Sequence, residues 1–364
     1  MFLYRAFLSF AVAGILGFLS TPAFAQAAGA KGENFLYRVV MNDTLGALAE
    51  RFTTGPANWT ILQTLNNVQD ATKLPVGLVL KIPFSLIPEL PSSARVNHLA
   101  GHATVNGQML QRASQIIEGQ TVRTGPDGFV TLELDDGSAL SVLASSSLTM
   151  KRLRVFKGTG LTDSIIEVGN GSLESEVAPQ QKGVGRFEVR TPVSVTGVRG
   201  TRLRVHVTSQ GAQSEVVKGQ AGVDGTQASE VLLHEKQGVA VNTDGKHLGV
   251  RDLLPAPELP VPVRGGAGWM MDFPAVSGAS AYLVRVAADL NGANLVSSHQ
   301  FPAAPVQFSA PGPGTYYVFV RALDAMGIGG MDAMQSFEGQ LVLQTSGGQP
   351  VLSGSGQPVA VANY

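Results

Sequence analysis

The chain has 364 residues, no Cys, and 26 Lys and Arg against 27 Asp and Glu, which gives a formal net charge of −1. A charge so close to zero gives no electrostatic case for binding nucleic acid or anionic lipid. The lack of Cys excludes disulfides and a cysteine nucleophile, and 43 Gly with few charged and aromatic residues is typical of a β-rich chain.

Residues 1–25 have the pattern of a secretory signal peptide. Arg5 supplies one positive charge, Ala6–Ser20 is almost wholly apolar, and Ala23-Phe24-Ala25 fits a small-residue cleavage site. We expect export to the periplasm or cell envelope with cleavage near Ala25, and no transmembrane segment in the mature chain. The alternative is an uncleaved anchor. Loss of Arg5 would take the formal charge from −1 to −2.

Residues 36–83 predict a small β-α-α-β module. Leu36–Met41 is β-branched and apolar, as in a strand, and Asp43 or Thr44 is a suitable helix N-cap. The apolar residues that follow have helical spacing, and we expect Leu45, Leu48 and Leu65 to be core. Asn58 is the expected N-cap of a second helix, Asn66-Asn67 its end, and Val79–Ile82 a closing strand.

This order resembles a LysM domain, a module that binds N-acetylglucosamine glycans such as peptidoglycan and chitin. The resemblance rests on Asp43-Thr44-Leu45, on Asn66, and on Leu74-Pro75-Val76-Gly77 before the last strand. It implies a glycan-binding groove between two loops. The implied glycan-binding residues are Asn42, Asp43, Thr44, Leu45, Asn66, Leu74, Pro75, Val76 and Gly77. The family usually has Gly at the position of Asn42, and Asn also adopts positive φ.

Residues 84–98, with Pro88 and Pro91, read as a linker to a second domain over residues 99–250. There, short alternating strands such as Val130–Leu134 are separated by turns such as Gly125-Pro-Asp-Gly128, which predicts an all-β domain.

The second domain resembles the FecR type. The resemblance rests on these segments: Glu118–Gly125, Gly128–Ser138, Gly171–Leu173, Phe187–Pro192 leading into Val198–Thr201, Lys218-Gly219 and Gly222-Val223. It implies a twisted β-solenoid-like domain built from repeated β-rungs. We interpret Gly200 as a tight corner between rungs rather than as a functional residue.

The last part of the chain predicts a proline-rich linker, a third domain and a tail. Residues 254–262 carry four prolines, which favours an extended spacer. Residues 263–343 resemble a fibronectin type III-like or immunoglobulin-like β-sandwich. Residues 345–364 are rich in Gly and Ser and are expected to be disordered.

The sequence offers no catalytic, metal or cofactor site. His98 and His102 are four residues apart in a segment that does not read as helix, and Asp135 and Asp136 are adjacent in a turn. No zinc-peptidase spacing and no nucleophile elbow occurs. We therefore expect no catalytic residues, no metal, no cofactor and no enzymatic activity.

Together these features predict a mainly β, multidomain envelope protein that binds peptidoglycan through its first module. Its β-domains would contact an envelope protein of unknown identity. One alternative is a signalling component that senses its partner through the FecR-type domain. Another is an activator of a cell-wall hydrolase.

Overall fold

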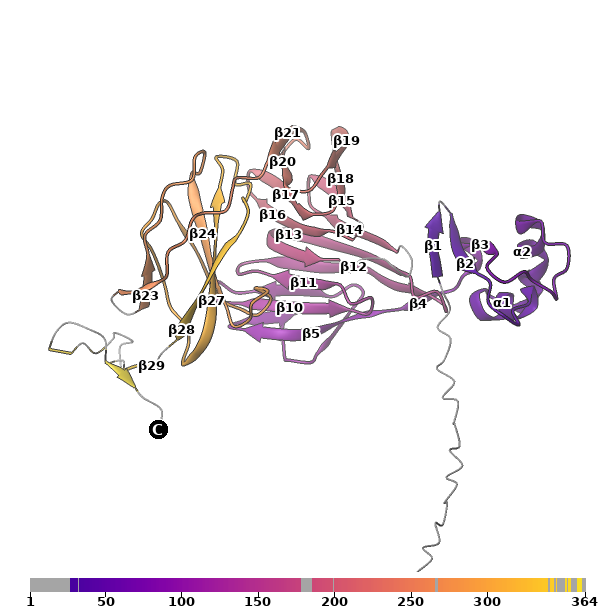
Figure 1. Cartoon of the computed structure of the whole chain (residues 1–364), viewed down its shortest axis with the longest axis horizontal. Coiled ribbons are helices and arrows are strands. Elements are labelled where there is room, and N and C mark those ends of the chain that lie inside the picture. Colours follow the sequence, from indigo (N-terminus) through magenta and orange to yellow (C-terminus); the bar gives the residue numbers. More distant parts are fainter. Residues whose placement is uncertain are drawn as a thin grey trace, which may run out of the picture.

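The computed structural model describes residues 27–31, 33–177, 185–198, 200–265, 268–339, 341–343, 345, 351, 353–354 and 359–361. The predicted signal peptide and most of the predicted disordered tail lie outside these residues. Three parts follow one another along the long axis of the molecule: a small α/β module, a central β domain and a β-sandwich (Figure 1). The predicted fold class, mainly β and multidomain, is confirmed.

The small module packs two helices against a three-stranded sheet of order β1-β2-β3. Thr44 is the N-cap of the first helix, and its side chain accepts a hydrogen bond from the backbone N–H of Ala47 at 3.2 Å. Asn67 ends the second helix with φ 52°, the left-handed geometry that Asn tolerates. The elements are β1 (Ala27–Lys31), β2 (Asn34–Arg38), α1 (Leu45–Phe52), η1 (Pro56–Asn58), α2 (Trp59–Asn66) and β3 (Val79–Pro83).

Two local predictions in this module are wrong, and a third, the helix cap at Asn58, is only partly right. The first strand ends at Arg38, so Met41 belongs to the loop that follows it. Leu65 is 39% exposed, because α2 buries only Leu62 against the rest of the module. Asn58 occupies the N-cap position, but its side chain donates to Thr53 and Thr54 instead of capping the helix.

The central domain has two facing layers of strands with one hydrophobic core between them. One layer contains β4, β6, β7, β9, β12, β14, β15, β18 and β19, and the other contains β5, β8, β10, β11, β16, β17, β20 and β21. The bounds are β4 (Glu89–Pro91), β5 (Ser93–Ala100), β6 (Ala103–Val105), β7 (Gln108–Met109), β8 (Gln115–Ile117), β9 (Thr121–Thr124), β10 (Phe129–Leu134), β11 (Ala139–Val142), β12 (Ser147–Phe156), β13 (Thr162–Glu176), β14 (Arg186–Arg190), β15 (Ser194–Val198), β16 (Arg202–Thr208), β17 (Gly211–Lys218), β18 (Ala221–Gly225), β19 (Ala228–Leu233), β20 (Gln237–Asn242) and β21 (His247–Asp252).

Strand β13 belongs to both layers. Its first part pairs with β12 and β14, and its last part, from Gly171 on, pairs with β11 and β16. Gly171 has φ 82° where the strand changes layer. Gly200, with φ 61°, lies between β15 of one layer and β16 of the other. The structure thus confirms that Gly200 is a corner, because positive φ is the backbone geometry that favours Gly.

The segment 84–98 is not a free linker. It begins with a short helix, η2 (Phe84–Leu86), and continues as β4 and most of β5. These strands pair with β12, β8 and β10 of the central domain. Pro88 and Pro91 do not prevent this, because Pro is compatible with strand ends and edge strands.

The C-terminal domain is a β-sandwich of two sheets, with strand orders β22-β23-β26 and β25-β24-β27-β28. Its core contains Phe273, Tyr282 and Phe337 among other residues. The described residues also include a short pair formed by β29 and β30 near the C-terminus. The bounds are β22 (Val263–Gly265), β23 (Gly268–Met271), β24 (Ala281–Ala287), β25 (Leu295–Phe301), β26 (Val306–Phe308), β27 (Gly314–Leu323), β28 (Ala333–Gly339), β29 (Leu341–Val342) and β30 (Ala360–Val361).

The proline-rich segment 254–262 lies against the sandwich instead of standing free as a spacer. The backbone N–H of Met331 donates to the carbonyl of Leu254 at 2.8 Å, and Gln335 donates to the carbonyl of Leu259 at 3.1 Å. Leu254 and Leu259 also pack on the sandwich core.

The small module and the central domain share hydrophobic side chains. Leu161, in the turn between β12 and β13, is 1% exposed within the core of the small module. The ring of Phe156 lies 4.8 Å from that of Phe84, and Lys157 donates to backbone carbonyls at Glu50 and Thr53. The β12–β13 turn is therefore part of the small module's packing.

Among the described residues, no helix has the length and apolar character that crossing a bilayer requires.

Candidate functional site

The two loops implied as a glycan groove lie side by side in the small module. The backbone N–H of Val39 donates to the carbonyl of Leu78 at 2.8 Å, and that of Gly77 donates to the carbonyl of Val39 at 2.9 Å. Asn42 has φ 70° and Gly77 has φ 88°. The predicted positive φ at Asn42 is confirmed, so Asn serves the turn where the LysM family usually has Gly.

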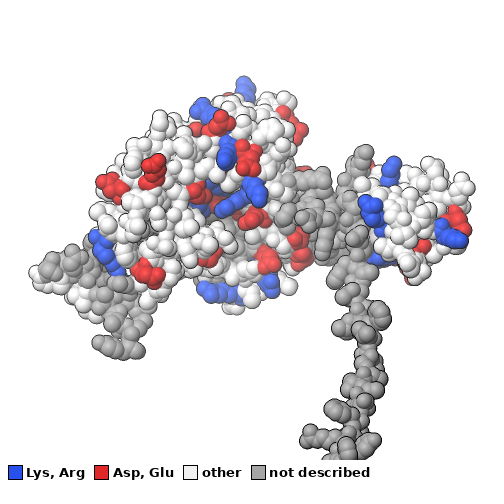
Figure 2. All heavy atoms as spheres, viewed as in Figure 1, with Lys and Arg blue, Asp and Glu red and all other residues white. Residues whose placement is uncertain are grey.

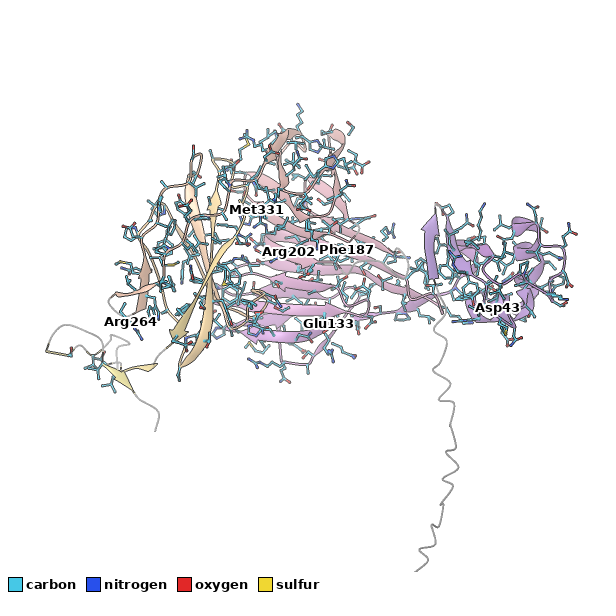
Figure 3. The ribbon with its side chains drawn as sticks, in the orientation of Figure 1. Asp43, Glu133, Phe187, Arg202, Arg264 and Met331 are labelled. Atoms are coloured by element: carbon cyan, nitrogen blue, oxygen red, sulfur yellow. The ribbon has the colours of Figure 1, made fainter. Side chains whose placement is uncertain are left out.

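Asp43 shapes the first loop from within. One of its carboxylate oxygens accepts hydrogen bonds from the backbone N–H of Val40 and from the hydroxyl of Tyr37, both at 2.8 Å. Burial, reinforced by Asp43, raises the pKa of Tyr37 to about 12, so this hydroxyl remains a donor at neutral pH. Asp43 lies at the end of the molecule farthest from the sandwich residue Arg264 (Figure 3).

Asn66 joins the second helix to the last strand. Its amide nitrogen donates to the carbonyls of Leu62 and Lys81, and its amide oxygen accepts from the backbone N–H of Lys81 at 2.7 Å. The bonds to Lys81 occupy backbone groups of the edge strand β3. Asn66 therefore holds the end of α2 against β3, and few of its amide hydrogen-bonding positions remain for a sugar.

Of the nine sequence-predicted residues, two are buried, three are exposed, and Asp43, Thr44, Asn66 and Gly77 are partly buried. Leu45 and Leu74 are buried and support the loops from below. Asn42, Pro75 and Val76 are exposed, and Val76 is 68% exposed. Met41, which sequence reasoning placed in a strand, is 75% exposed beside Asn42. The loops thus present two large apolar side chains, Met41 and Val76, with backbone groups around them.

The chemically suggestive residues of the central domain have structural partners. His98 makes a 2.9 Å hydrogen bond with the carbonyl of Leu295, whereas His102 pairs with Asp127. Asp135 accepts from Ser92, and Asp136 accepts from Thr162. The described part of the chain contains no group of three or more His, Cys, Asp or Glu residues arranged for a metal ion.

A second concentration of polar groups, which the sequence did not reveal, joins the central domain to the sandwich. We call it the interdomain charge cluster, and its members are Glu174, Arg204, Glu215, Arg285, Arg321 and Asp332. Glu174 Oε1 accepts from Arg285 at 2.8 Å and from Arg321 at 2.7 Å. Both arginines also donate to Asp332 at 2.8 Å.

Arg204 and Glu215 are hydrogen-bonded to the backbone of the loop between β27 and β28. Arg204 Nη2 donates to the carbonyls of Gly329 and Gly330, and Glu215 accepts from the backbone N–H of Gly329 at 2.6 Å. Arg204 Nε lies 2.8 Å from Glu215 Oε2, but without the alignment of a hydrogen bond.

The cluster shifts the pKa values of its carboxyl groups in opposite directions. Burial alone would raise the pKa of Glu174, but Arg285 and Arg321 outweigh it and hold this pKa at about 2. For Asp332 the same arginines also outweigh burial and lower the pKa. At Glu215 burial prevails over Arg204 and raises the pKa.

Charges on the molecular surface are mixed. On the face shown in Figure 2, Lys and Arg side chains lie beside Asp and Glu side chains over the central domain. Elsewhere among the described residues, Lys151 and Glu167 form a surface ion pair. This fits the near-zero net charge of the chain.

Comparison with protein families identifies two parts of the chain. Residues 37–83 match the LysM domain, and residues 120–241 match the FecR protein family. The chain carries a LysM domain followed by a FecR domain. The resemblances drawn from the loop and turn motifs are thereby confirmed.

Three solved structures have a distant likeness to the chain. Two crystal structures of a candidate anti-sigma factor from Parabacteroides distasonis are 19% and 20% identical with TM-scores of 0.30, and each match covers 36% of this chain. The chain spans 59% of the length of that protein. The FN1-FN3 domains of chicken CNTN1 are 10% identical over 69% of this chain and 99% of that one, with a TM-score of 0.17. No curated protein matches the chain.

Proposed function

We propose that this protein is a non-enzymatic component of the bacterial cell envelope that binds peptidoglycan through its LysM domain. The observation that carries the proposal is the pair of adjoining loops at Asn42–Leu45 and Leu74–Gly77. Val39, just before the first loop, is hydrogen-bonded to Gly77 and Leu78, and Asp43 fixes the first loop through the backbone N–H of Val40. Met41 and Val76 are exposed beside them. Fixed backbone groups suit the acetamido and hydroxyl groups of N-acetylglucosamine, and exposed apolar groups suit the C–H faces of the ring.

The FecR domain and the sandwich would then contact an envelope protein. Signalling through the FecR domain is the second candidate function, supported by the match of residues 120–241 to that family. One site of this size is expected to bind weakly, with avidity from repeated units along the glycan.

We expect Val76→Asp to reduce co-sedimentation of the full chain with purified peptidoglycan by about tenfold. The change removes apolar contact with the sugar and places a solvated charge there, at a cost of about 1–2 kcal/mol. Val76 is 68% exposed, so the LysM domain should keep its stability.

Met109→Asp is the matched control, because Met109 is 63% exposed on β7 of the FecR domain. It should sediment like the unmodified protein. If the unmodified chain fails to sediment with peptidoglycan and chitin, or if both variants lose binding equally, the loops are not the glycan site.

A further inference from the structure

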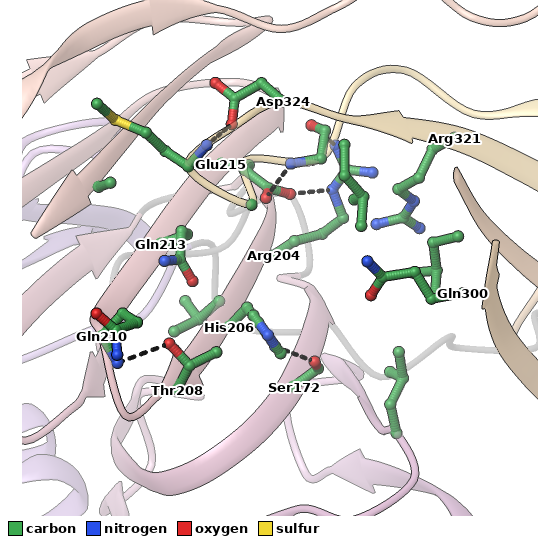
Figure 4. A pocket seen from close by; sticks show the side chains of 18 of the residues that line it. Ser172, Arg204, His206, Thr208, Gln210, Gln213, Glu215, Gln300, Arg321 and Asp324 are labelled. Carbon is green, nitrogen blue, oxygen red and sulfur yellow. Dashed lines mark hydrogen bonds and ion pairs between the residues drawn. The ribbon is translucent and has the colours of Figure 1, made fainter. Parts of the chain in front are cut away.

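An open cavity of about 890 Å³ lies between the FecR domain and the sandwich (Figure 4). One wall is the outer face of β16, β17 and β20, and the other is formed by β24, β25, β27 and the loop at 324–329. Small-molecule sites of folded proteins commonly have this volume and often lie at domain interfaces.

The FecR wall is built from cross-strand rows of side chains. Glu174, Arg204 and Glu215 are register partners on β13, β16 and β17, and they are engaged with the sandwich as the interdomain charge cluster. The next row on the same face consists of Ser172, His206 and Gln213. This row lines the cavity.

The second row is polar and partly unpaired. Ser172 and His206 form a 2.6 Å hydrogen bond, and burial lowers the pKa of His206, which favours its neutral form. Gln213 is only 6% exposed, yet its Oε1 accepts no hydrogen bond from the protein. A buried amide oxygen without a donor is costly, so a donor supplied by a ligand would be favourable.

The facing wall adds amide, hydroxyl and apolar groups. Gln300 and Leu283 are register partners on β25 and β24, and Ser298 lies on the same strand as Gln300. Met326 extends the wall from the loop after β27. The cavity therefore offers hydrogen-bonding groups on both walls with apolar side chains between them.

Where the cavity meets the interdomain charge cluster, the positive and negative charges of the cluster cancel. Three arginines face three carboxylates in the interdomain charge cluster, and these groups are paired with one another or with backbone. An ionic ligand would meet no net opposite charge there, although the buried Nε and Nη1 groups of Arg204 donate no hydrogen bond to any described residue. The lining favours an uncharged ligand.

The residues that line the cavity include no Phe, Tyr or Trp. A peptide backbone, which carries alternating N–H and C=O groups, is matched by amides and hydroxyls such as those of Gln213, Gln300 and Thr208. Leu283 and Met326 could receive small apolar side chains. We propose that this cavity binds a short, uncharged, extended peptide segment, a site separate from the LysM loops and independent of their proposed function.

The proposal can be tested by methyl NMR on the full chain with labelled Met. Met326 lines the cavity and Met41 lies at the LysM loops, so the two methyl signals, assigned through Met326→Leu and Met41→Leu, report on the two sites separately. We expect the capped tripeptide N-acetyl-Ala-Ala-Ala-amide, at millimolar concentration, to shift the Met326 signal saturably and to leave Met41 unchanged. Chitobiose should shift Met41 and leave Met326 unchanged.

Two variants establish where the peptide binds. Gln213→Leu keeps similar volume but removes the amide, and should weaken the Met326 response about tenfold. Thr208 is an exposed residue of the cavity lining, so Thr208→Trp should fill the cavity opening and abolish the Met326 response. Ser209 is also exposed but does not line the cavity, so Ser209→Trp should keep the Met326 response. The remaining Met signals verify that each variant is folded.

The proposal is overturned if the capped tripeptide leaves Met326 unchanged in the unmodified protein, or if its response survives Thr208→Trp. A Met326 response to chitobiose without one to the peptide would make the cavity a sugar site instead. Loss of the chitobiose response at Met41 alone would contradict only the LysM proposal.

Discussion

Replacing Glu174 with Gln should lower the stability of the sandwich within the full chain by about 3 kcal/mol. The change leaves Arg285 and Arg321, which are 2% and 4% exposed, without one of the carboxylates that compensate them. Breaking a buried ion pair by removing one partner typically costs 3–5 kcal/mol, because the remaining charge is buried and poorly paired. Asp332 still contacts both arginines, which favours the lower end of this range.

The two tryptophans make this measurement selective. Trp59 lies in α2 of the LysM domain and Trp269 in β23 of the sandwich, and the chain has only these two. Denaturant unfolding followed by fluorescence in a Trp59→Phe background reports the sandwich alone. Glu167→Gln is the matched control on the same strand, because Glu167 pairs with Lys151 at the surface, where such pairs contribute about 0–1 kcal/mol. Equal losses in the two variants would show that the interdomain charge cluster does not join the domains.

The carboxyl group of Glu174 should also make the stability of the interdomain charge cluster sensitive to acid. The pKa of Glu174 is about 2 in the folded protein against an ordinary value of 4.5. The unfolded chain therefore binds more protons between these pH values, and stability should be fully present above pH 4.5 and fall as the pH drops toward 2. Glu215 acts in the opposite direction, because its pKa is raised, but it is present in both proteins. The difference between unmodified protein and Glu174→Gln should shrink across this pH window, and a constant difference would contradict the assignment.

Gly171→Ala should destabilise the FecR domain by about 3 kcal/mol. Gly171 has φ 82°, and a Cβ there would lie 2.2 Å from the Ser146 hydroxyl and 2.6 Å from its Cα. Left-handed geometry costs an L-residue about 1–2 kcal/mol, and forcing atoms into a filled site costs about 1–3 kcal/mol. Ser146 cannot move away easily, because its hydroxyl accepts from the backbone N–H of Ser172.

Gly169→Ala provides the control on the same strand. A Cβ at Gly169 would meet nothing closer than 3.9 Å, so this variant should stay within about 0.5 kcal/mol of the unmodified protein. Far-UV circular dichroism during denaturant unfolding follows the β-structure of the chain, and most of its strands belong to the FecR domain. If the two variants unfold alike, Gly171 is not the constrained point at which β13 changes layer.

Local patterns predicted the loops of the LysM domain well. Thr44 caps α1, Asn42 adopts positive φ, and Asn67 ends α2, because each depends on backbone geometry within a few residues. Leu65 was wrongly assigned to the core, since an apolar residue at helical spacing does not show whether another element covers it. Residues 84–98 were wrongly read as a linker, because their strand partners lie far along the chain.

The interdomain charge cluster and the cavity could not be found from the sequence. Arg204 reaches Gly329, and Arg321 reaches Glu174, each across more than a hundred residues. No spacing or motif signals such pairs, because the sheets that bring them together are defined only by the complete fold. The same holds for Gln213 and Gln300, which face the cavity from different domains.

Strand β13 connects the LysM domain to the sandwich and would carry tension between them. It starts beside Leu161, which is embedded in the LysM core, and ends near Glu174, which is bonded to the sandwich. Its 15 residues would span at most about 50 Å at roughly 3.3 Å per residue, because the strand changes layer at Gly171. Tension between a LysM domain held on the cell wall and a partner held by the sandwich would run along this strand. It would load the hydrogen bonds to β12 and β16 in shear, so that many must rupture together, and the protein would act as a stiff tether of fixed reach rather than as a flexible one.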